Sequence, residues 1–137
     1  MKIYISGSIY GGTQKIETYQ KLIPALEKYG EVLDKQIADS NTIENEKNQK
    51  DEDIFQDLEQ KIMMADIIFA EVTIQSLGVG YELGFADKIG KKIIAIYDET
   101  YTKKVSTMIR GNKRIKLIPY KNIEEIINNL EELLKVN

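Results

Sequence analysis

The amino-acid sequence of 137 residues contains no cysteine and no histidine. The chain therefore cannot form disulfides, zinc sites built on those ligands, a cysteine nucleophile or a histidine-based catalytic triad. If the protein is an enzyme, its acid–base groups must be Asp, Glu, Tyr or Lys. We expect neither a metal nor another cofactor.

Long apolar runs and an excess of positive charge are also missing. No stretch approaches the roughly 18–20 apolar residues that span a bilayer, and the N-terminus has no secretory signal pattern. The formal net charge of −3 is not that of a broadly basic nucleic-acid binder. We expect a cytoplasmic protein of one domain, residues 1–137, that binds neither membranes nor nucleic acid.

Short apolar runs alternate with segments of helical periodicity along the whole chain. The runs predict strands at 3–5, 31–33, 66–72, 91–97 and 115–118. Such an alternation predicts a five-stranded parallel α/β sheet with helices on both faces. Ligands of such sheets bind beyond the carboxyl ends of the strands.

The predicted helices cover 14–29, 54–65, 81–89 and 123–134, with a loop or short helix at 106–111. Thr13 is the expected N-cap of the first helix, and Pro24 predicts a kink or an interruption in it. Pro119 is expected to close the last strand.

The polar segment 38–52 predicts a solvated loop or a short surface helix. The alternative is a lid over a site, because long loops in small domains are often functional.

Two glycine-containing loops fall where a ligand is expected. The first, residues 6–12, offers backbone N–H groups and two hydroxyls to an anion or a sugar hydroxyl, although its glycines can also be tight-turn residues. The second, residues 76–84, places Glu82 in the predicted first turn of a helix, where the dipole favours the ionised carboxylate. Glu82 is then either a nucleophile or base at the ligand, or a charge that only complements the helix end.

A second carboxylate precedes this loop. Asp57 lies at the edge of the apolar face of the predicted helix 54–65. It can pair with Glu82, since two carboxylates in different environments cleave glycosidic bonds, or form an exposed ion pair with Lys61. Tyr4 in the first strand is either a core aromatic or a hydroxyl that orients Glu82.

Several motifs together resemble a known family. They are Tyr4, Gly7-Ser8-Ile9 with Gly11-Gly12, Ala70-Glu71-Val72-Thr73, the block Ser76-Leu77-Gly78-Val79-Gly80-Tyr81-Glu82-Leu83-Gly84, and Ser106 with Met108-Ile109-Arg110-Gly111. In this order they resemble the 2'-deoxynucleoside 5'-phosphate N-hydrolases, within the wider nucleoside 2-deoxyribosyltransferase family. The resemblance runs through nearly the whole chain.

The resemblance implies a flavodoxin-like (Rossmann-like) three-layer sandwich and a retaining, double-displacement hydrolysis of the N-glycosidic bond. Glu82 matches the nucleophile that attacks C1', Tyr4 the tyrosine that positions it, and Asp57 the aspartate that assists departure of the base. Ser8 and Ser76 match the 5'-phosphate cradle, and Ser106 matches a serine supplied by the neighbouring subunit. A homodimer is therefore implied, with Ser106 and Met108 reaching the partner's site.

The substrate-binding residues implied in this way are Ser6, Gly7, Ser8, Ile9, Tyr10, Gly11, Gly12, Tyr19, Gln36, Ser76, Gly78, Ser106 and Met108.

Three positions depart from the family pattern. Tyr10 stands where an Arg is expected, so Lys15 or Arg110 would have to supply a cation for the phosphate. Gln36 stands where a His is expected, and the interval from Asp57 to Asp66 is one residue longer than usual. Deoxyribosyl transfer between bases is the alternative activity, and a nucleotide-sensing module is the non-enzymatic alternative.

Overall fold

The computed structural model describes residues 1–9, 15–102 and 104–135. Its centre is a five-stranded sheet in which every neighbouring pair is parallel, with the order β2-β1-β3-β4-β5. The strands are β1 Lys2–Gly7, β2 Glu31–Leu33, β3 Ile67–Glu71, β4 Lys92–Asp98 and β5 Ile115–Tyr120. This is the flavodoxin-like strand order, so the predicted fold is confirmed.

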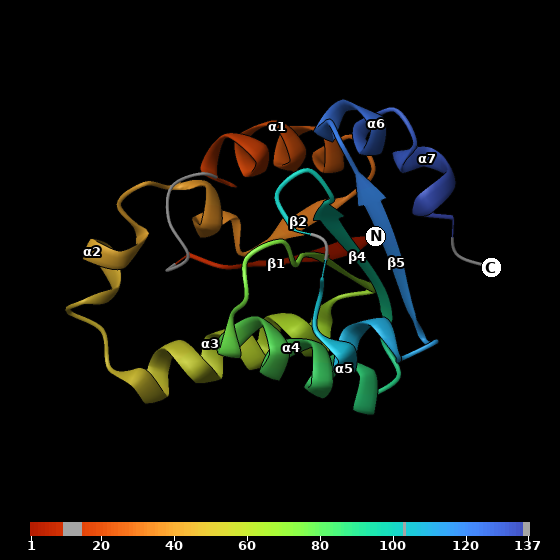
Figure 1. Ribbon diagram of the computed structural model, residues 1–137. Coiled ribbons are helices and arrows are strands. Elements are labelled where there is room, and N and C mark those ends of the chain that lie inside the picture. The colour runs from red at the N-terminus through yellow and green to blue at the C-terminus, as the bar shows by residue number, and fades with distance from the viewer. Residues whose placement is uncertain (10–14, 103, 136–137) are drawn as a thin grey trace.

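Helices cover both faces of the sheet (Figure 1). One layer holds α1 Ile16–Glu27, α6 Ile123–Ile127 and α7 Leu130–Leu133, and the other holds α3 Asp51–Met64, α4 Leu77–Lys88 and α5 Thr107–Arg110. A 3₁₀ helix, η2 Lys35–Ala38, and α2 Thr42–Glu46 connect β2 to α3. No helix among the described residues is long and apolar enough to cross a membrane.

The core has two halves, one on each face of the sheet, because successive side chains of a strand point to opposite faces. In β1, Ile3 and Ile5 pack with the α1 and α6 layer, whereas Tyr4 packs with the α3 and α4 layer. Every residue of the central strand β3 is buried, which explains its continuous apolar run.

Two helices differ from the prediction in their extent. Of the two effects expected at Pro24, the interruption is wrong: the helix continues through it, because Leu22, Ile23 and Leu26 are buried against the sheet and this packing outweighs the lost backbone hydrogen bond. The kink stays a prediction. The last predicted helix is instead two short helices, α6 and α7, separated by Asn128 and Asn129, both of which are poor helix formers. The expected cap at Thr13 lies outside the described residues.

The start of α4 is a further correction, and it matters for the site. The helix begins at Leu77, four residues before the predicted start, because the Ser76 hydroxyl accepts the Val79 N–H at 3.3 Å and caps it. Gly78 and Gly80 therefore lie inside the helix. Glu82 consequently occupies the second turn and not the first.

The last strand also runs further than expected. Pro119 lies inside β5, opposite Tyr97, and does not close it. A proline is tolerated there because β5 is an edge strand, with one side free of sheet partners.

Candidate active site

A cavity of about 410 Å³ opens at the carboxyl ends of β1 and β2. It lies beside the β1–β3 junction, where the strand order reverses and where such sheets bind ligands. Its walls come from β1, the segment after β2, α2, α3 and the start of α4. The lining includes Tyr4, Ser6, Gly7, Ile9, Asp34, Gln36, Thr42, Glu46, Leu58, Glu59, Ser76, Gly78 and Glu82.

Glu82 is held in this cavity by two hydroxyl groups from β1. The Ser6 hydroxyl donates to Glu82 Oε2 at 2.8 Å, and the Tyr4 hydroxyl also hydrogen-bonds the carboxylate. Tyr4 and Ser6 are two residues apart on one strand, so both face the α4 side of the sheet. This two-residue spacing could have identified Ser6 as a partner of Glu82, whereas the sequence motifs predict Ser6 only as a substrate contact.

Burial raises the pKa of Glu82, and the hydrogen bonds from Ser6 and Tyr4 offset this only in part. The negative charge of Asp34 raises it further. The expectation that a helix dipole favours the ionised form is therefore wrong, since Glu82 is not in the first turn. Burial and the nearby Glu82 charge raise the pKa of Tyr4, which keeps its hydroxyl protonated as a donor.

The structure does not bring Asp57 into the cavity. Its side chain is 57% exposed and pairs with Lys61 Nζ at 2.7 Å, one turn further along α3. This is the ion pair that the sequence offered as the alternative role. The residues that face the cavity from this helix include Leu58 and Glu59.

A carboxylate that sequence reasoning missed lines the cavity instead. Asp34 directly follows β2, and its side chain is 11% exposed and lies 3.6 Å from Lys61 Nζ. Its position after a parallel strand, at the edge where ligands bind, is the signal that could have identified it.

The glycine loop is described only in part. Gly7 and Ile9 line the cavity, whereas Tyr10, Gly11 and Gly12 lie outside the described residues. A Cβ at Gly7 would come within 2.5 Å of the Tyr19 hydroxyl oxygen, so close contact with Tyr19 requires glycine there. Tyr19 is buried, does not line the cavity, and donates to the Ser8 carbonyl at 3.4 Å. Ser8 is also buried and does not line it.

The two cations proposed to replace the missing arginine already have partners. Lys15 Nζ lies 2.8 Å from Asp98 Oδ2 and 3.3 Å from the Tyr120 hydroxyl, and its side chain is buried. Arg110 Nε donates to the Val105 carbonyl at 2.8 Å. Neither residue lines the cavity.

Ser106 and Met108 lie in a different hollow, between α4 and α5. The Ser106 hydroxyl accepts the Met108 N–H at 3.3 Å and caps α5, and Met108 is 82% exposed. Neither residue reaches the Glu82 cavity of its own chain.

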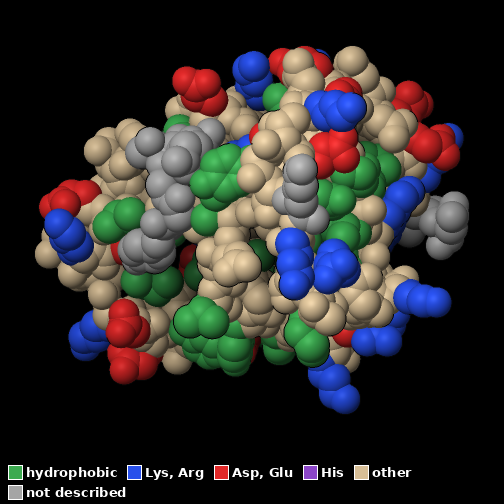
Figure 2. Space-filling view, in the orientation of Figure 1, with side chains coloured by type: hydrophobic (Ala, Val, Ile, Leu, Met, Phe, Trp, Pro, Cys, Tyr) green, Lys and Arg blue, Asp and Glu red, His purple; other side chains and the backbone are tan. Residues whose placement is uncertain are grey.

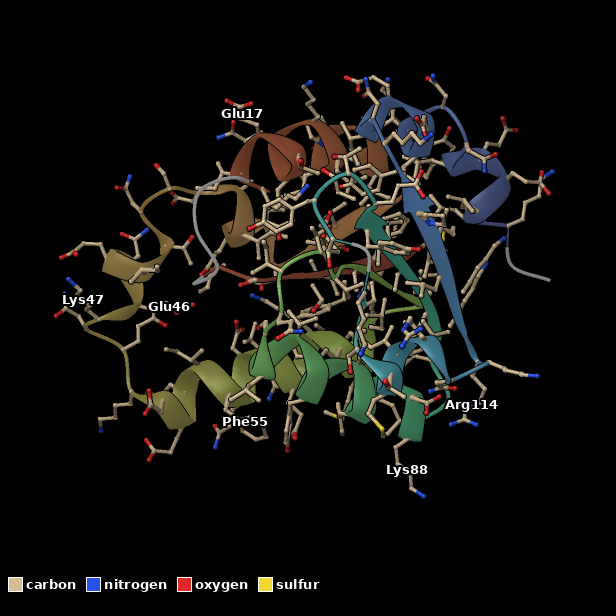
Figure 3. The ribbon with its side chains drawn as sticks, in the orientation of Figure 1. Glu17, Glu46, Lys47, Phe55, Lys88 and Arg114 are labelled. Carbon is tan, nitrogen blue, oxygen red and sulfur yellow. The ribbon has the colours of Figure 1, made fainter. Side chains whose placement is uncertain are left out.

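The polar segment forms one wall of the cavity. Thr42 is buried and donates to the Gln36 carbonyl, which ties α2 to the segment after β2. Glu46 points from α2 toward the cavity, whereas Lys47 points away (Figure 3). Part of the segment is thus the predicted short surface helix; whether it closes as a lid stays a prediction.

Across residues 1–9, 15–102 and 104–135 no group of three or more acidic side chains could hold a metal ion. The chemistry that the cavity offers is therefore that of Glu82 and its hydroxyl donors: a nucleophile or base close to further carboxylates.

The sequence is similar to a known family and to known proteins. A family model described as Nucleoside 2-deoxyribosyltransferase matches residues 3–125. A protein of Esox lucius named 5-hydroxymethyl-dUMP N-hydrolase is 42% identical over 142 residues, which cover 98% of this chain and 97% of that protein. A Danio rerio protein of the same name is 39% identical over 135 residues, covering 96% and 94%.

A solved structure, the CMP N-glycosidase of Clostridium botulinum, shares the fold with a TM-score of 0.67 at 23% identity, over 96% of this chain and 99% of that one. The resemblance found in the sequence motifs is thus confirmed, and the chain belongs to the nucleoside 2-deoxyribosyltransferase family.

Proposed function

We propose that this protein hydrolyses the N-glycosidic bond of 2'-deoxynucleoside 5'-monophosphates, with Glu82 as the nucleophile. The observation that carries the proposal is the half-buried Glu82 carboxylate, held by Ser6 and Tyr4 in a cavity at the carboxyl edge of the sheet. The names of the relatives agree with it, since 5-hydroxymethyl-dUMP is a nucleotide of this class.

The proposed reaction has two displacements. A Glu82 oxygen bonds to C1' while the C1'–N bond breaks and its electron pair leaves with the base, which takes up a proton. Water then attacks C1' and gives up a proton, the bond to Glu82 breaks, and 2-deoxyribose 5-phosphate is released. The Tyr4 and Ser6 hydroxyls position the carboxylate for attack in the first step and stabilise it as the leaving group in the second.

The same proposal includes a homodimer. Leu77, Tyr81 and Met108 are 97%, 65% and 82% exposed, and they come from α4 and α5, which also flank the hollow that holds Ser106. Hydrophobic side chains gather over this part of the molecule in Figure 2. Exposed apolar groups of this kind are typical of protein–protein contacts, and covering them would place Ser106 and Met108 between two subunits.

Transfer of deoxyribose to another base is the second candidate function. The family model is described by that activity, and Tyr10 replaces the arginine expected for the phosphate. Both reactions use the same covalent intermediate. They differ in whether water or a second base attacks C1'.

One set of incubations separates the two functions. We would incubate the protein with dGMP, dUMP or 5-hydroxymethyl-dUMP, with deoxyguanosine, and with deoxyguanosine plus adenine, and measure free base and new nucleoside. Release of base from a monophosphate alone supports hydrolysis. New nucleoside that forms only with adenine present would replace hydrolysis by transfer. No product in any incubation would overturn both.

The covalent step has its own test. Rapid quenching of a reaction and intact-mass measurement should show a deoxyribose 5-phosphate adduct on the wild type and none on Glu82→Ala. An adduct on another residue, or turnover by Glu82→Ala at the wild-type rate, would remove Glu82 from the mechanism.

A further inference from the structure

The proposed role of Glu82 as the nucleophile does not explain why Asp34 lies in the same cavity. It directly follows Leu33, which pairs with Tyr4 in the register of β1 and β2. It lines the same cavity as Glu82 and Tyr4, and its side chain is only 11% exposed. A largely enclosed carboxylate therefore lies close to the hydroxyl that holds the proposed nucleophile.

The backbone at Asp34 is in an unusual conformation. Its φ of 60° and ψ of 61° are left-handed, and it is the one described non-glycine residue with positive φ. Apart from glycine, Asp and Asn adopt this conformation most readily, because their short side chains can hydrogen-bond locally. Sparsely populated conformations persist where the surrounding structure fixes them and are concentrated at functional sites.

The other carboxylates of the cavity wall differ from Asp34. Glu46, Asp51 and Glu59 come from helices α2 and α3, whereas Asp34 lies at the sheet edge. The negative charge of Asp34 raises the pKa of both Glu82 and Tyr4, so Asp34 acts on both groups across the cavity. A neighbouring negative charge favours the protonated form of a carboxylate, so one proton held between two such groups costs less than ionising both.

The hydrogen-bond partners indicate which of the two carries that proton. Glu82 accepts from Ser6 and Tyr4, and these bonds favour its ionised form. Burial raises the pKa of Asp34, and the cation that opposes this, Lys61, lies 3.6 Å from Asp34 but 2.7 Å from Asp57. Asp57 thus holds the Lys61 ammonium closer to itself than to Asp34.

We propose that Asp34, and not Asp57, is the general acid that protonates the departing base. The inference rests on the hydrolysis proposed above. As the C1'–N bond breaks, the electron pair stays on the base and the Asp34 proton is transferred to it. Asp34, now ionised, takes a proton from the water that attacks C1', and Glu82 is released as a carboxylate. Both groups return to their starting states.

The test compares bases that need a proton with bases that leave readily without one. The substrate pairs are dGMP with 7-methyl-dGMP, whose base is already cationic, and dUMP with 5-fluoro-dUMP, whose base is a better leaving group. Asp34→Asn should slow the release of base in the first turnover of dGMP or dUMP, measured by rapid quenching, by about 10²–10⁴-fold. First-turnover release should change by less than about fivefold for 7-methyl-dGMP, and the loss with 5-fluoro-dUMP should be smaller than with dUMP.

A pH profile gives an independent readout. An acid must be protonated to act, so wild-type kcat should fall as the pH rises through the pKa of Asp34. This alkaline fall should be absent from Asp34→Asn. The charged and titratable groups that interact with Asp34 include Lys61, Asp57, Tyr4 and Glu82, and the carboxylates of Glu46, Asp51 and Glu59 line the same cavity; all of these are unchanged in the variant.

The control is Asp53→Asn, which makes the same chemical change at an exposed residue of α3 that does not line the cavity. Its kcat should match the wild type, and circular dichroism should show that both variants fold. Equal losses on the members of each substrate pair would overturn the assignment in favour of a binding role. So would a loss confined to bases that carry an amino group.

The wild-type measurements show separately whether the proposed hydrolysis itself fails. If the wild type releases no base from any monophosphate, the hydrolysis and the role of Asp34 both fall. If the wild type is active and Asp34→Asn equals it on dGMP and dUMP, only the assignment of Asp34 falls.

Discussion

Two clusters of buried and half-buried charge lie at the same edge of the sheet and behave in opposite ways. In the first, Lys15 bonds Asp98 and Tyr120, the Tyr120 hydroxyl donates to Glu71, and Glu71 accepts the Thr73 N–H at 2.6 Å. We call these five residues the lysine cluster. In the second, Glu82 and Asp34 face a cavity and rely mainly on hydroxyl donors and a shared lysine.

Burial and hydrogen bonding act on the carboxylates of both clusters, but a different one of these two effects dominates in each. Burial would raise the pKa of Asp98, but hydrogen bonds from the Lys15 ammonium and from Thr100 lower it below its usual range. Burial raises the pKa of Glu82, and two neutral hydroxyls do not reverse this. A carboxylate that is paired with its own cation is held in the ionised form and stabilises the fold. A carboxylate without such a cation has a raised pKa, which costs stability and leaves its oxygens available to a ligand.

Of the substitutions that test this comparison, the replacement of Glu82 should have the largest effect. Glu82→Gln removes the proposed nucleophile and should lower kcat by about 10⁴-fold or more. The free energy of unfolding should increase in this variant. In the wild type, Glu82 binds a proton more tightly in the folded state than in the unfolded state, so its protonation stabilises the fold at low pH. This stabilisation is lost as the pH rises from the ordinary Glu pKa through the raised pKa of the folded state.

The variant lacks this pH dependence. Glu82→Gln should therefore be more stable than the wild type at pH 8, on the order of 1 kcal/mol, and the difference should shrink toward pH 4. Thermal unfolding across that range measures it. A wild type that gains stability with pH over the same interval, relative to Glu82→Gln, would contradict the raised pKa.

Breaking the lysine cluster should have the next largest effect, this time on stability. Lys15→Met leaves Asp98 without its cation, and removing one partner of a buried pair costs about 3–5 kcal/mol. The control is Lys21→Met, which breaks an exposed pair with Glu124 and should cost less than about 1 kcal/mol. Urea unfolding measures both. Equal costs would show that the lysine cluster is not structural.

A smaller effect is expected at Tyr4, a positioning residue. Tyr4→Phe keeps the buried ring but removes one donor to Glu82, and kcat/KM should fall by about 10–100-fold. Loss of that hydrogen bond raises the pKa of Glu82 further. Because the nucleophile must be ionised, the acidic limb of the pH–rate profile should move to higher pH. A fall in rate with an unmoved profile would mean that Tyr4 acts only through packing.

The smallest effect should be that of Asp57. Asp57→Asn breaks an exposed ion pair and should change kcat by less than about threefold near the pH optimum. Lys61 would then act on Asp34 alone and lower the Asp34 pKa, so the alkaline limb should move to lower pH. A loss of about 100-fold would restore the role that the family resemblance implied for Asp57.

The sheet was predictable because its signals are local. Apolar runs bounded by glycine and polar residues marked all five strands, and their alternation with helices determined the parallel arrangement. The helix ends were less predictable, because packing decides them. Pro24 continues its helix through buried neighbours, and the glycines of α4 lie inside a helix that Ser76 caps.

The position of Glu82, the proposed nucleophile, at the cavity was predictable from the motif around it, and that of the second carboxylate was not. Glu82 follows a glycine-rich block after a central strand, which is a pattern of type and spacing. Asp34 reaches the cavity through a left-handed turn after a three-residue strand, and no spacing rule encodes that turn. On α3, one residue of register separates the side chain that lines the cavity, Leu58, from the one that pairs with Lys61, Asp57.

Pro119 has a consequence for how copies of this chain can meet. It lies inside the edge strand β5, where it removes one backbone donor, and the opposite edge, β2, is only three residues long. Neither edge is a good template for a strand of another molecule, so runaway stacking of sheets into fibrils is disfavoured. Contacts between copies of this chain are therefore expected on the helical faces, where they can produce a dimer.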